Sequence, residues 1–339
     1  MVTRKDVAKR ANVSVTAVSR ALNNSGYVAK DKKAAIFKAA EELGYCPNPI
    51  ALSLQKKRSR QLLYCCKDLS NEFYMNLYRG MVKEAEKHDY TVVMITTSQY
   101  ERIKDMLIDG VMIANENLAE DYMNLVGKNY NLPVVYADFG DMKSFSKSVL
   151  RADTDLYQAV EMAISYLRSL GHVKIAYAGP YDIHSPSSRH FAYLKEMKPV
   201  FSKDLDQYLF CKDFLLKEEG KGLEEEKFYE KGEMAAAQFV KSCCDATAVL
   251  CFNDSFAFGF CNEFLKHNGN IPNDLSVMGI DAVSNYQRTN PVLSSIDTNP
   301  FMQGQNCVKL LIDAIEDKKE KYVLHTKLTI FKGETVKRI

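Results

Sequence analysis

Short apolar runs recur along the chain from about residue 61 and alternate with amphipathic stretches. The first series of runs is LLYCC, TVVMIT, GVMIA and PVVYA, with amphipathic stretches around 73–88, 101–108 and 118–130. The second series is VKIAYAG, TAVLCF and SVMGI, with helices expected around 156–170, 188–198, 230–242 and 254–267. Strands that alternate with helices form parallel sheets covered on both faces. The pattern therefore predicts an α/β body of two doubly wound lobes, with a ligand site between them at the strand ends.

The first 46 residues have a different pattern, which predicts three short helices. A helix over Asp6–Arg10 is followed by Asn12 at a left-handed turn, and Ser14 is placed to cap a second helix through Arg20. The third helix lies within DKKAAIFKAAEELGY and ends at a glycine. This arrangement predicts a helix-turn-helix whose Val15, Thr16 and Arg20 side chains would meet a major groove. The fragment alone also fits an ordinary helical hairpin.

The segment after the third helix reads CPNPIALSLQKK and predicts a very short helix. Pro47 ends the preceding helix, Asn48 can cap the next one, and Pro49 suits its first turn. So short a helix does not persist alone in water, so it would form only against a partner helix or a DNA groove. Leu54 then fits an apolar wedge at a base step in the minor groove. The alternative is an interdomain linker with one exposed leucine.

Charge separates the beginning of the chain from the rest. Residues 1–60 carry 13 Lys and Arg against 4 Asp and Glu, whereas the remainder carries 32 against 39. A basic head on a mildly acidic body indicates a polyanionic partner for the head only. No apolar run reaches the ~18 residues of a membrane span, and the first segment lacks the apolar core of a signal peptide. We therefore expect a soluble cytoplasmic protein.

Nine cysteines include two adjacent pairs, Cys65-Cys66 and Cys243-Cys244, without a CxxC motif or histidines at ligand spacing. Several lie in apolar runs, where a reduced cysteine behaves as a small hydrophobe. We expect buried free thiols, no metal and no cofactor.

The motif DVA…VS…VSR…LGY.PN..A..L, spread over residues 2 to 54, resembles the DNA-binding head and hinge of the lac repressor family (LacI/GalR). In that family the residues that match Val15, Thr16 and Arg20 read the major groove, and the residue that matches Leu54 intercalates at the centre of a palindromic operator. Asn12 and Pro49 differ from many members without breaking the pattern. The DNA contacts expected from the resemblance are Ser14, Val15, Thr16, Arg20, Asn23, Ala51 and Leu54.

The body resembles the same family over nearly its whole length, through DLSNEFYMNLYRGMVKEAEKHDY, YLRSLGHVKIAYAG and FNDSFAFGF…IPNDLSVMGIDAVSNYQRTNPVLSSI. The resemblance implies a two-lobed periplasmic-binding-protein-like body with parallel sheets. The residues that stand where family members contact their effector are Phe73, Tyr74, Asp138, Arg189, Asn253 and Asp281, with Thr298 as a weaker candidate. Carboxylates and a guanidinium suit vicinal hydroxyls, and an aromatic face suits a sugar ring.

Each of these positions also has a structural alternative. Asp254 beside Asn253 could cap the following helix, Asp281 could close a turn after Gly279, and Arg189 could be a solvated charge on a helix. Three further features depart from typical members: the connection SQYERIKDMLID is short, Ala282 replaces an acidic residue, and Pro300 replaces an aromatic one. The short first lobe resembles the branch that responds to galactosides or other oligosaccharides, which favours a sugar effector.

The expected domains are a helix-turn-helix head over 1–46, a hinge helix and linker over 47–59, and an effector-binding and dimerisation body over 60–339. The first lobe would comprise about 60–152 and 299–322, and the second about 153–298 and 323–339. Two heads must meet two half-sites related by a twofold axis, and the chain ends without a leucine-rich heptad tail, so a homodimer is expected.

The leading interpretation is a transcriptional repressor that a small sugar releases from a palindromic double-stranded DNA operator. One alternative is a regulator that needs a corepressor, either a nucleobase or a phosphorylated partner protein. A more remote alternative is a sugar-binding protein or a glycoside-processing enzyme. The chain contains no nucleophile elbow, phosphate-binding glycine loop, metal spacing or convincing carboxylate pair, so we do not expect an enzyme.

Overall fold

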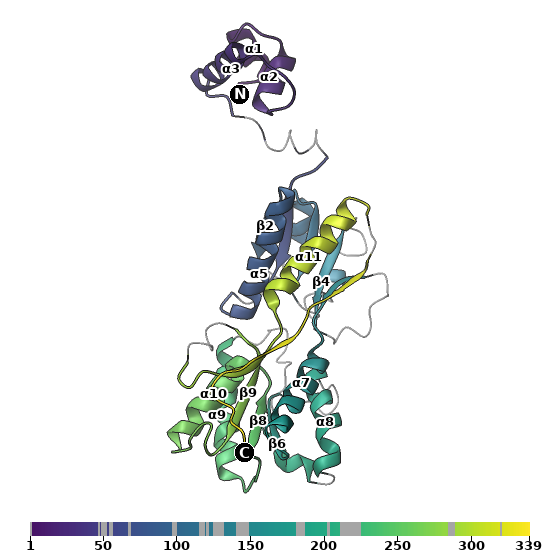
Figure 1. Cartoon of the computed structure of the whole chain (residues 1–339). Helices are drawn as coiled ribbons and strands as arrows, with labels where there is room; N and C mark the ends of the chain where they lie inside the picture. The colour runs from purple at the N-terminus through teal and green to yellow at the C-terminus, as the bar shows by residue number, and fades with distance from the viewer. Residues whose placement is uncertain are drawn as a thin grey trace. The chain divides into compact units, whose positions relative to one another are not determined.

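The structure is a computed structural model, and it divides the chain into two compact units, Met1–Ser59 and Arg60–Ile339 (Figure 1). The residues that it describes are 2–46, 48, 53, 57–66, 69–96, 100–114, 119, 122–124, 132–139, 149–180, 187–201, 204–210, 225–283, 289–318 and 321–339. Ala51, Leu54 and Pro49 therefore lie outside the described residues, as does most of the amphipathic stretch 118–130.

The first unit contains the predicted helix-turn-helix, formed by α1 (Arg4–Arg10), α2 (Val15–Leu22) and α3 (Lys30–Glu42). Asn12 has a φ of 51°, so the turn is left-handed as predicted. The Ser14 hydroxyl accepts a hydrogen bond from the Ala17 N–H at 3.1 Å and caps α2. The buried core is small, being Val7, Ala8, Val18, Ala21, Ile36, Ala39 and Ala40.

The first lobe of the second unit is built on a six-stranded sheet in the order β2–β1–β3–β4–β5–β11, with every pairing parallel. Four of its strands match the predicted apolar runs: β1 (Gln61–Cys65), β2 (Thr91–Ile95), β3 (Gly110–Ile113) and β4 (Val134–Asp138). The sequence did not predict β5 (Leu150–Asp153), in which buried and half-buried positions alternate. The stretch expected to be amphipathic at 101–108 is a short 3₁₀ helix, η2 (Tyr100–Asp105).

The second lobe contains the other six-stranded sheet, in the order β7–β6–β8–β9–β10–β12. Its predicted strands are present as β6 (Ile175–Ala178), β8 (Ala248–Cys251) and β9 (Ser276–Asp281). The sheet is completed by β7 (Leu209–Phe210), β10 (Ser294–Asp297) and β12 (Thr329–Phe331), and only β12 runs antiparallel, against β10. The predicted helices are α7 (Leu156–Ser169), α8 (Ser188–Phe201), α9 (Glu225–Lys241) and α10 (Asp254–Lys266).

The chain returns to the second lobe later than the expected boundary at 322. The strand β11 (Val323–His325) pairs in parallel with β5 and therefore belongs to the first sheet. Residue 323 was expected to begin the last segment of the second lobe, but the change of sheet occurs between His325 and Thr329.

Both lobes contain a pair of closely packed helices with glycine at the contact. In the first lobe α5 (Glu72–Ala85) lies beside α11 (Pro300–Ile315), and a Cβ atom on Gly304 would lie 2.0 Å from the Leu77 carbonyl oxygen (Figure 1). In the second lobe a Cβ atom on Gly259 of α10 would lie 2.0 Å from the Tyr229 carbonyl oxygen of α9. Only glycine allows the two backbones to approach so closely.

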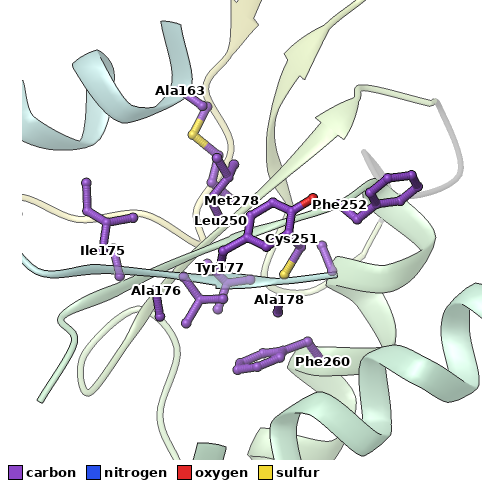
Figure 2. Close-up of a cluster of buried hydrophobic side chains, with 14 of the residues drawn as sticks. Ala163, Ile175, Ala176, Tyr177, Ala178, Leu250, Cys251, Phe252, Phe260 and Met278 are labelled. Atoms are coloured by element: carbon purple, nitrogen blue, oxygen red, sulfur yellow. The ribbon is translucent and has the colours of Figure 1, made fainter. Parts of the chain in front are cut away.

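The core of the second lobe includes buried thiols, as predicted for part of the cysteine set. Figure 2 shows Cys251 among Tyr177, Phe260 and Met278. Burial raises the pKa of the Cys65 and Cys261 thiols to about 12, which keeps them protonated and unreactive. Cys46 and Cys243 are exposed, so the expectation of burial was wrong for these two. None of the described helices is both long enough and apolar enough to cross a membrane.

Candidate DNA-binding surface and effector site

The start of α2 presents the side chains that were predicted to read DNA. Val15 is 42% exposed, and Ser14, Thr16 and Arg20 are also exposed. Val18, on the opposite face, is fully buried against the other two helices and fixes the orientation of α2. Helix α2 therefore offers a short row of apolar and hydrogen-bonding groups followed by a cation, which suits base edges.

Asn23 differs from the other predicted DNA contacts because it is half-buried at the C-cap of α2. Its amide donates to the Ser19 hydroxyl at 3.4 Å, and an Arg4 guanidinium nitrogen donates to the same hydroxyl at 3.3 Å. These contacts tie the beginning of α1 to the end of α2. Asn23 therefore makes a local contact at the end of α2, and the link between the two helices is the bond from Arg4 to Ser19.

The second lobe brings three of the predicted effector contacts together. Arg189 comes from the first turn of α8, Asp281 ends β9, and Thr298 follows β10. An Arg189 Nη atom lies 3.4 Å from an Asp281 carboxylate oxygen, and the Thr298 hydroxyl lies 3.4 Å from the same oxygen. The Arg189 guanidinium also lies 4.3 Å from the centre of the Phe252 ring, a cation–π contact.

This cluster is buried but not saturated with hydrogen bonds. The Arg189 side chain is only 13% exposed, so it is not a solvated charge on the helix surface, which was the other interpretation of the sequence. Its Nε has no hydrogen-bond partner among the described residues, and its contact with Asp281 is long for a charge-assisted bond. A ligand can therefore accept from Arg189 without first breaking a tight ion pair.

Asp281 combines a buried carboxyl group with a strained backbone. Burial raises the pKa of its carboxyl to about 6, although the neighbouring Arg189 and Thr298 lower it. Its φ of 113° lies in a region that favours glycine, and Ala282 follows with a φ of 51°. Strain of this kind persists only where the surroundings hold the residue, and it is common at functional sites.

The helix α10 is capped by Asn253 and not, as the sequence also allowed, by Asp254. The Asn253 side chain caps α10 by accepting from the Phe256 N–H at 2.9 Å. The Asp254 carboxylate accepts instead from the Val283 N–H at 2.8 Å and from the Ser295 hydroxyl at 2.6 Å. The interpretation of Asp254 as the helix cap was therefore wrong, because α10 begins at Asp254 itself, one residue earlier than that role requires.

The first lobe contributes rings and an acid that is already paired. Phe73 contacts both Tyr74 and Phe139 edge to face, each with ring centres 5.5 Å apart. Asp138 ends β4 and is 1% exposed, and its carboxylate accepts from the Arg151 guanidinium at 2.9 Å. Much of the hydrogen-bonding capacity of Asp138 is thus used within its own lobe.

Sequence reasoning missed Phe139, Phe252 and Arg151. Phe139 packs against the hydrophobic cores of both lobes, and the Phe252 ring makes the cation–π contact with the Arg189 guanidinium. Each phenylalanine is adjacent in sequence to a predicted site residue at a strand end, which is the signal that could have found it. Arg151 lies on β5, a strand that the sequence did not predict. Among the described residues no group of three or more acidic, histidine or cysteine side chains is arranged to hold a metal ion.

Comparison with known families assigns both units. Residues 3–48 match the family described as bacterial regulatory proteins, lacI family, and residues 164–336 match the periplasmic binding protein-like domain. The HTH-type transcriptional repressor PurR of Vibrio vulnificus is 27% identical over 351 residues, which cover 100% of both chains. PurR of Vibrio campbellii is 26% identical over 349 residues, again with 100% coverage of both chains.

Solved structures share the fold. The lac repressor bound to ONPG in the repressed state has a TM-score of 0.77 at 21% identity, with 99% of each chain covered. A complex of the transcriptional regulator CelR with cellobiose has a TM-score of 0.66 at 19% identity, covering 99% of this chain and 100% of that one. A regulator from Enterococcus faecium with bound ribose has a TM-score of 0.67 at 24% identity, covering 82% and 99%.

A helix-turn-helix head joined to a two-lobed body of parallel sheets defines the class of DNA-binding transcriptional regulators. The chain belongs to the lacI family of bacterial regulatory proteins, with a periplasmic binding protein-like domain as its body.

Proposed function

We propose that the chain is an effector-controlled repressor that binds a palindromic operator as a homodimer. The observation that carries the proposal is the combination of exposed Val15, Thr16 and Arg20 on a basic head with the buried, unsaturated Arg189–Asp281 cluster in the body. The first surface is suited to reading base edges and the second to holding a small polar molecule. A repressor controlled by an effector requires both.

On the DNA side, Ser14, Val15, Thr16, Arg20 and Asn23 contact one half-site, while Ala51 and Leu54 act through the hinge. The hinge folds into a helix on the operator, and Leu54 inserts at the central base step. An effector that changes the angle between the lobes separates the two hinges in the dimer. The affinity then falls by the free energy that coupled folding had supplied, about 1–3 kcal/mol, or roughly 5- to 150-fold.

On the effector side, the first candidate is a small sugar held between the lobes. Arg189 and Asp281 supply a donor fork and an acceptor for vicinal hydroxyls, Thr298 lies next to Asp281, and Asn253 adds its side chain from the N-cap of α10. Phe73, Tyr74 and Asp138 contribute from the first lobe, the rings offering an apolar face. Cellobiose and ribose in the structures of fold relatives support this class of ligand.

The second candidate is a nucleobase that acts as a corepressor. A planar heterocycle presents a carbonyl to Arg189 and an N–H to Asp281, and it packs between rings such as Phe73 and Phe252. The similarity over the full chain to repressors named PurR favours this candidate. The two candidates predict opposite signs, since a sugar inducer weakens operator binding and a corepressor strengthens it.

The test is selection of bound duplexes from a random DNA pool by the full-length protein, at one fixed salt concentration. A palindrome with a flexible pyrimidine–purine step at its centre is the expected result, because the hinge wedge needs a step that unstacks easily. Binding that tracks only ionic strength and yields no consensus would contradict the proposal.

Leu54→Ala separates the hinge from the heads in the same selection. It should keep the two half-sites and the weak general affinity but lose the preference for the central step. Operator binding as tight as that of the wild type would show that Leu54 is not the wedge. Thr16→Ala is the matched control, since it should change the half-site preference and leave the central step intact.

A further inference from the structure

The turn that follows β9 has a backbone conformation that two non-glycine residues rarely adopt in succession. Asp281 has a φ of 113° and Ala282 a φ of 51°. Such a segment relaxes unless neighbouring groups hold it in place. The contacts around this turn therefore indicate what the strain supports.

Asp254 and Ser295 hold the turn by its backbone. Asp254 accepts from the Val283 N–H at 2.8 Å, and the Ala282 N–H donates to the Ser295 hydroxyl at 3.1 Å. That hydroxyl in turn donates to the other Asp254 oxygen at 2.6 Å. Asp254 is fully buried, and a Cβ atom on Gly279 would lie 2.3 Å from its carboxylate, so the glycine makes room for this network.

The two ends of the turn lie in different environments. Asp281 is paired in register with Asp297 in the second sheet and contacts Arg189 and Thr298. Val283, two residues later, is 5% exposed and belongs to the hydrophobic core of the first lobe, together with Phe73 and Leu77. The turn therefore leads from the polar cluster of one lobe directly into the apolar core of the other.

We propose that the turn Asp281–Val283 is the lever that couples the effector cluster to the first lobe, with Asp254 as the positioning residue that keeps it rigid. A ligand that displaces Asp281 moves Val283 with it, because two peptide units clamped by buried hydrogen bonds cannot absorb the displacement. The inference rests on the proposed function, since it requires an effector at the Arg189–Asp281 cluster.

The first experiment compares Val283→Ala with Val111→Ala in the full-length protein. Val111 lies on β3 and is fully buried in the same core cluster, so both variants lose two methyl groups from the first-lobe core but only one acts on the turn. Operator affinity is measured alone and with ribose, cellobiose or hypoxanthine added in parallel. The measured quantity is the ratio of the operator affinity with the probe to the operator affinity without it. In Val283→Ala this ratio should lie closer to 1 than in the wild type, by about 2- to 30-fold, and in Val111→Ala it should stay at the wild-type value.

The second experiment uses Asp254→Asn, which keeps one acceptor oxygen and replaces the other with a donor. Amide hydrogen exchange at Ala282 and Val283, measured without any added probe, should become faster than in the wild type. With a probe added, the affinity ratio should move toward 1 as in Val283→Ala. Unchanged exchange would show that Asp254 does not position the turn.

The outcomes separate the lever from the function on which it rests. A wild-type response that persists in Val283→Ala, or that falls equally in Val111→Ala, overturns the lever and leaves the effector site standing. Operator affinity of the wild type that none of the three probes changes overturns effector control for these classes of ligand, and the lever with it.

Discussion

The two lobes share one architecture but prepare their facing edges differently. Each has a six-stranded sheet and a pair of helices that meet at glycine. In the second lobe Arg189 and Asp281 face each other at a loose 3.4 Å, whereas in the first lobe Arg151 and Asp138 are joined at 2.9 Å. The first-lobe pair is thus the tighter one, although the Arg151 Nε, like the Arg189 Nε, has no hydrogen-bond partner among the described residues. The first lobe also offers aromatic rings.

This contrast shows that two carboxylates at strand ends can differ in how closely the protein itself pairs them. Asp138 and Asp281 both end a parallel strand and are both buried. Their pairing differs, because Asp281 has only long contacts with the described residues while Asp138 has a close guanidinium partner. We therefore expect polar recognition of an effector to depend mainly on the second lobe, with the first lobe contributing packing.

Removal of the arginine from each lobe should have the largest effect of the changes considered. Arg189→Ala should weaken effector binding by about 2–5 kcal/mol, at least ~30-fold, because the bound effector then loses its buried guanidinium donors. Arg151→Ala should chiefly lower the stability of the body, by roughly 1–3 kcal/mol, since its side chain is partly exposed. Calorimetric titration and urea unfolding of both variants measure the two effects. Equal losses of effector affinity would show that the lobes contribute alike.

The pH dependence of stability tests the strain on Asp281. Its raised pKa means that the folded state prefers the protonated acid, so this contribution to stability is present below about pH 4 and is lost as the pH rises through 6. Asp281→Asn keeps the neutral form at every pH. The variant should match the wild type near pH 4 and exceed it by up to roughly 3 kcal/mol above pH 6, at about 1.4 kcal/mol per pH unit.

Urea unfolding of both proteins across that pH window makes the measurement. A variant that is less stable than the wild type at high pH would indicate a firm Arg189–Asp281 ion pair that lowers the pKa instead. The distinction between the two lobes would then disappear.

The glycine at the helix–helix contact of each lobe is a feature that the two lobes share. Gly304→Ala in the first lobe and Gly259→Ala in the second should each destabilise the body by about 1–3 kcal/mol, because the added methyl group meets a carbonyl of the partner helix. Thermal unfolding should show a similar loss in both. If only one of the two variants lost stability, the helix pair of the other lobe would be able to move apart and accommodate the methyl group.

The smallest expected effect concerns the asparagine that caps a helix in each lobe. Asn71 accepts from the Phe73 N–H at 2.9 Å, as Asn253 does from Phe256, so Asn71→Ala and Asn253→Ala should each cost about 1 kcal/mol of stability. Asn253→Asp keeps the capping oxygen and replaces the amide donor with a carboxylate oxygen. It should preserve stability and weaken effector binding, while Asn71→Asp should change neither. Unaltered effector affinity in Asn253→Asp would limit Asn253 to capping.

The sequence predicted the seven apolar strands and the helix-turn-helix because those elements depend on local patterns. It missed β5 and β10, whose sequences LRAD and SSID are short and mix polar with apolar residues. The left-handed turn at Asn12 and the Ser14 cap were likewise visible in local sequence.

The sequence predicted which residues form the candidate site but not which of them contact each other. Strand ends and the family resemblance located Arg189, Asp281 and Thr298, which the structure brings together. The pairing of Asp138 with Arg151 depends on the register of two neighbouring strands, one of them unpredicted, so no local pattern reveals it. The choice between Asn253 and Asp254 as the cap required the first residue of α10, which sequence patterns locate only to within a few residues.

The most direct test of the account is an operator titration of the full-length protein at fixed salt, repeated with each member of a panel of sugars and nucleobases. We expect that at least one compound changes operator affinity by about 5-fold or more, and that Arg189→Ala removes the change while Arg151→Ala retains it. Operator affinity that no compound alters, or a response that survives in Arg189→Ala, would contradict effector control through the second lobe.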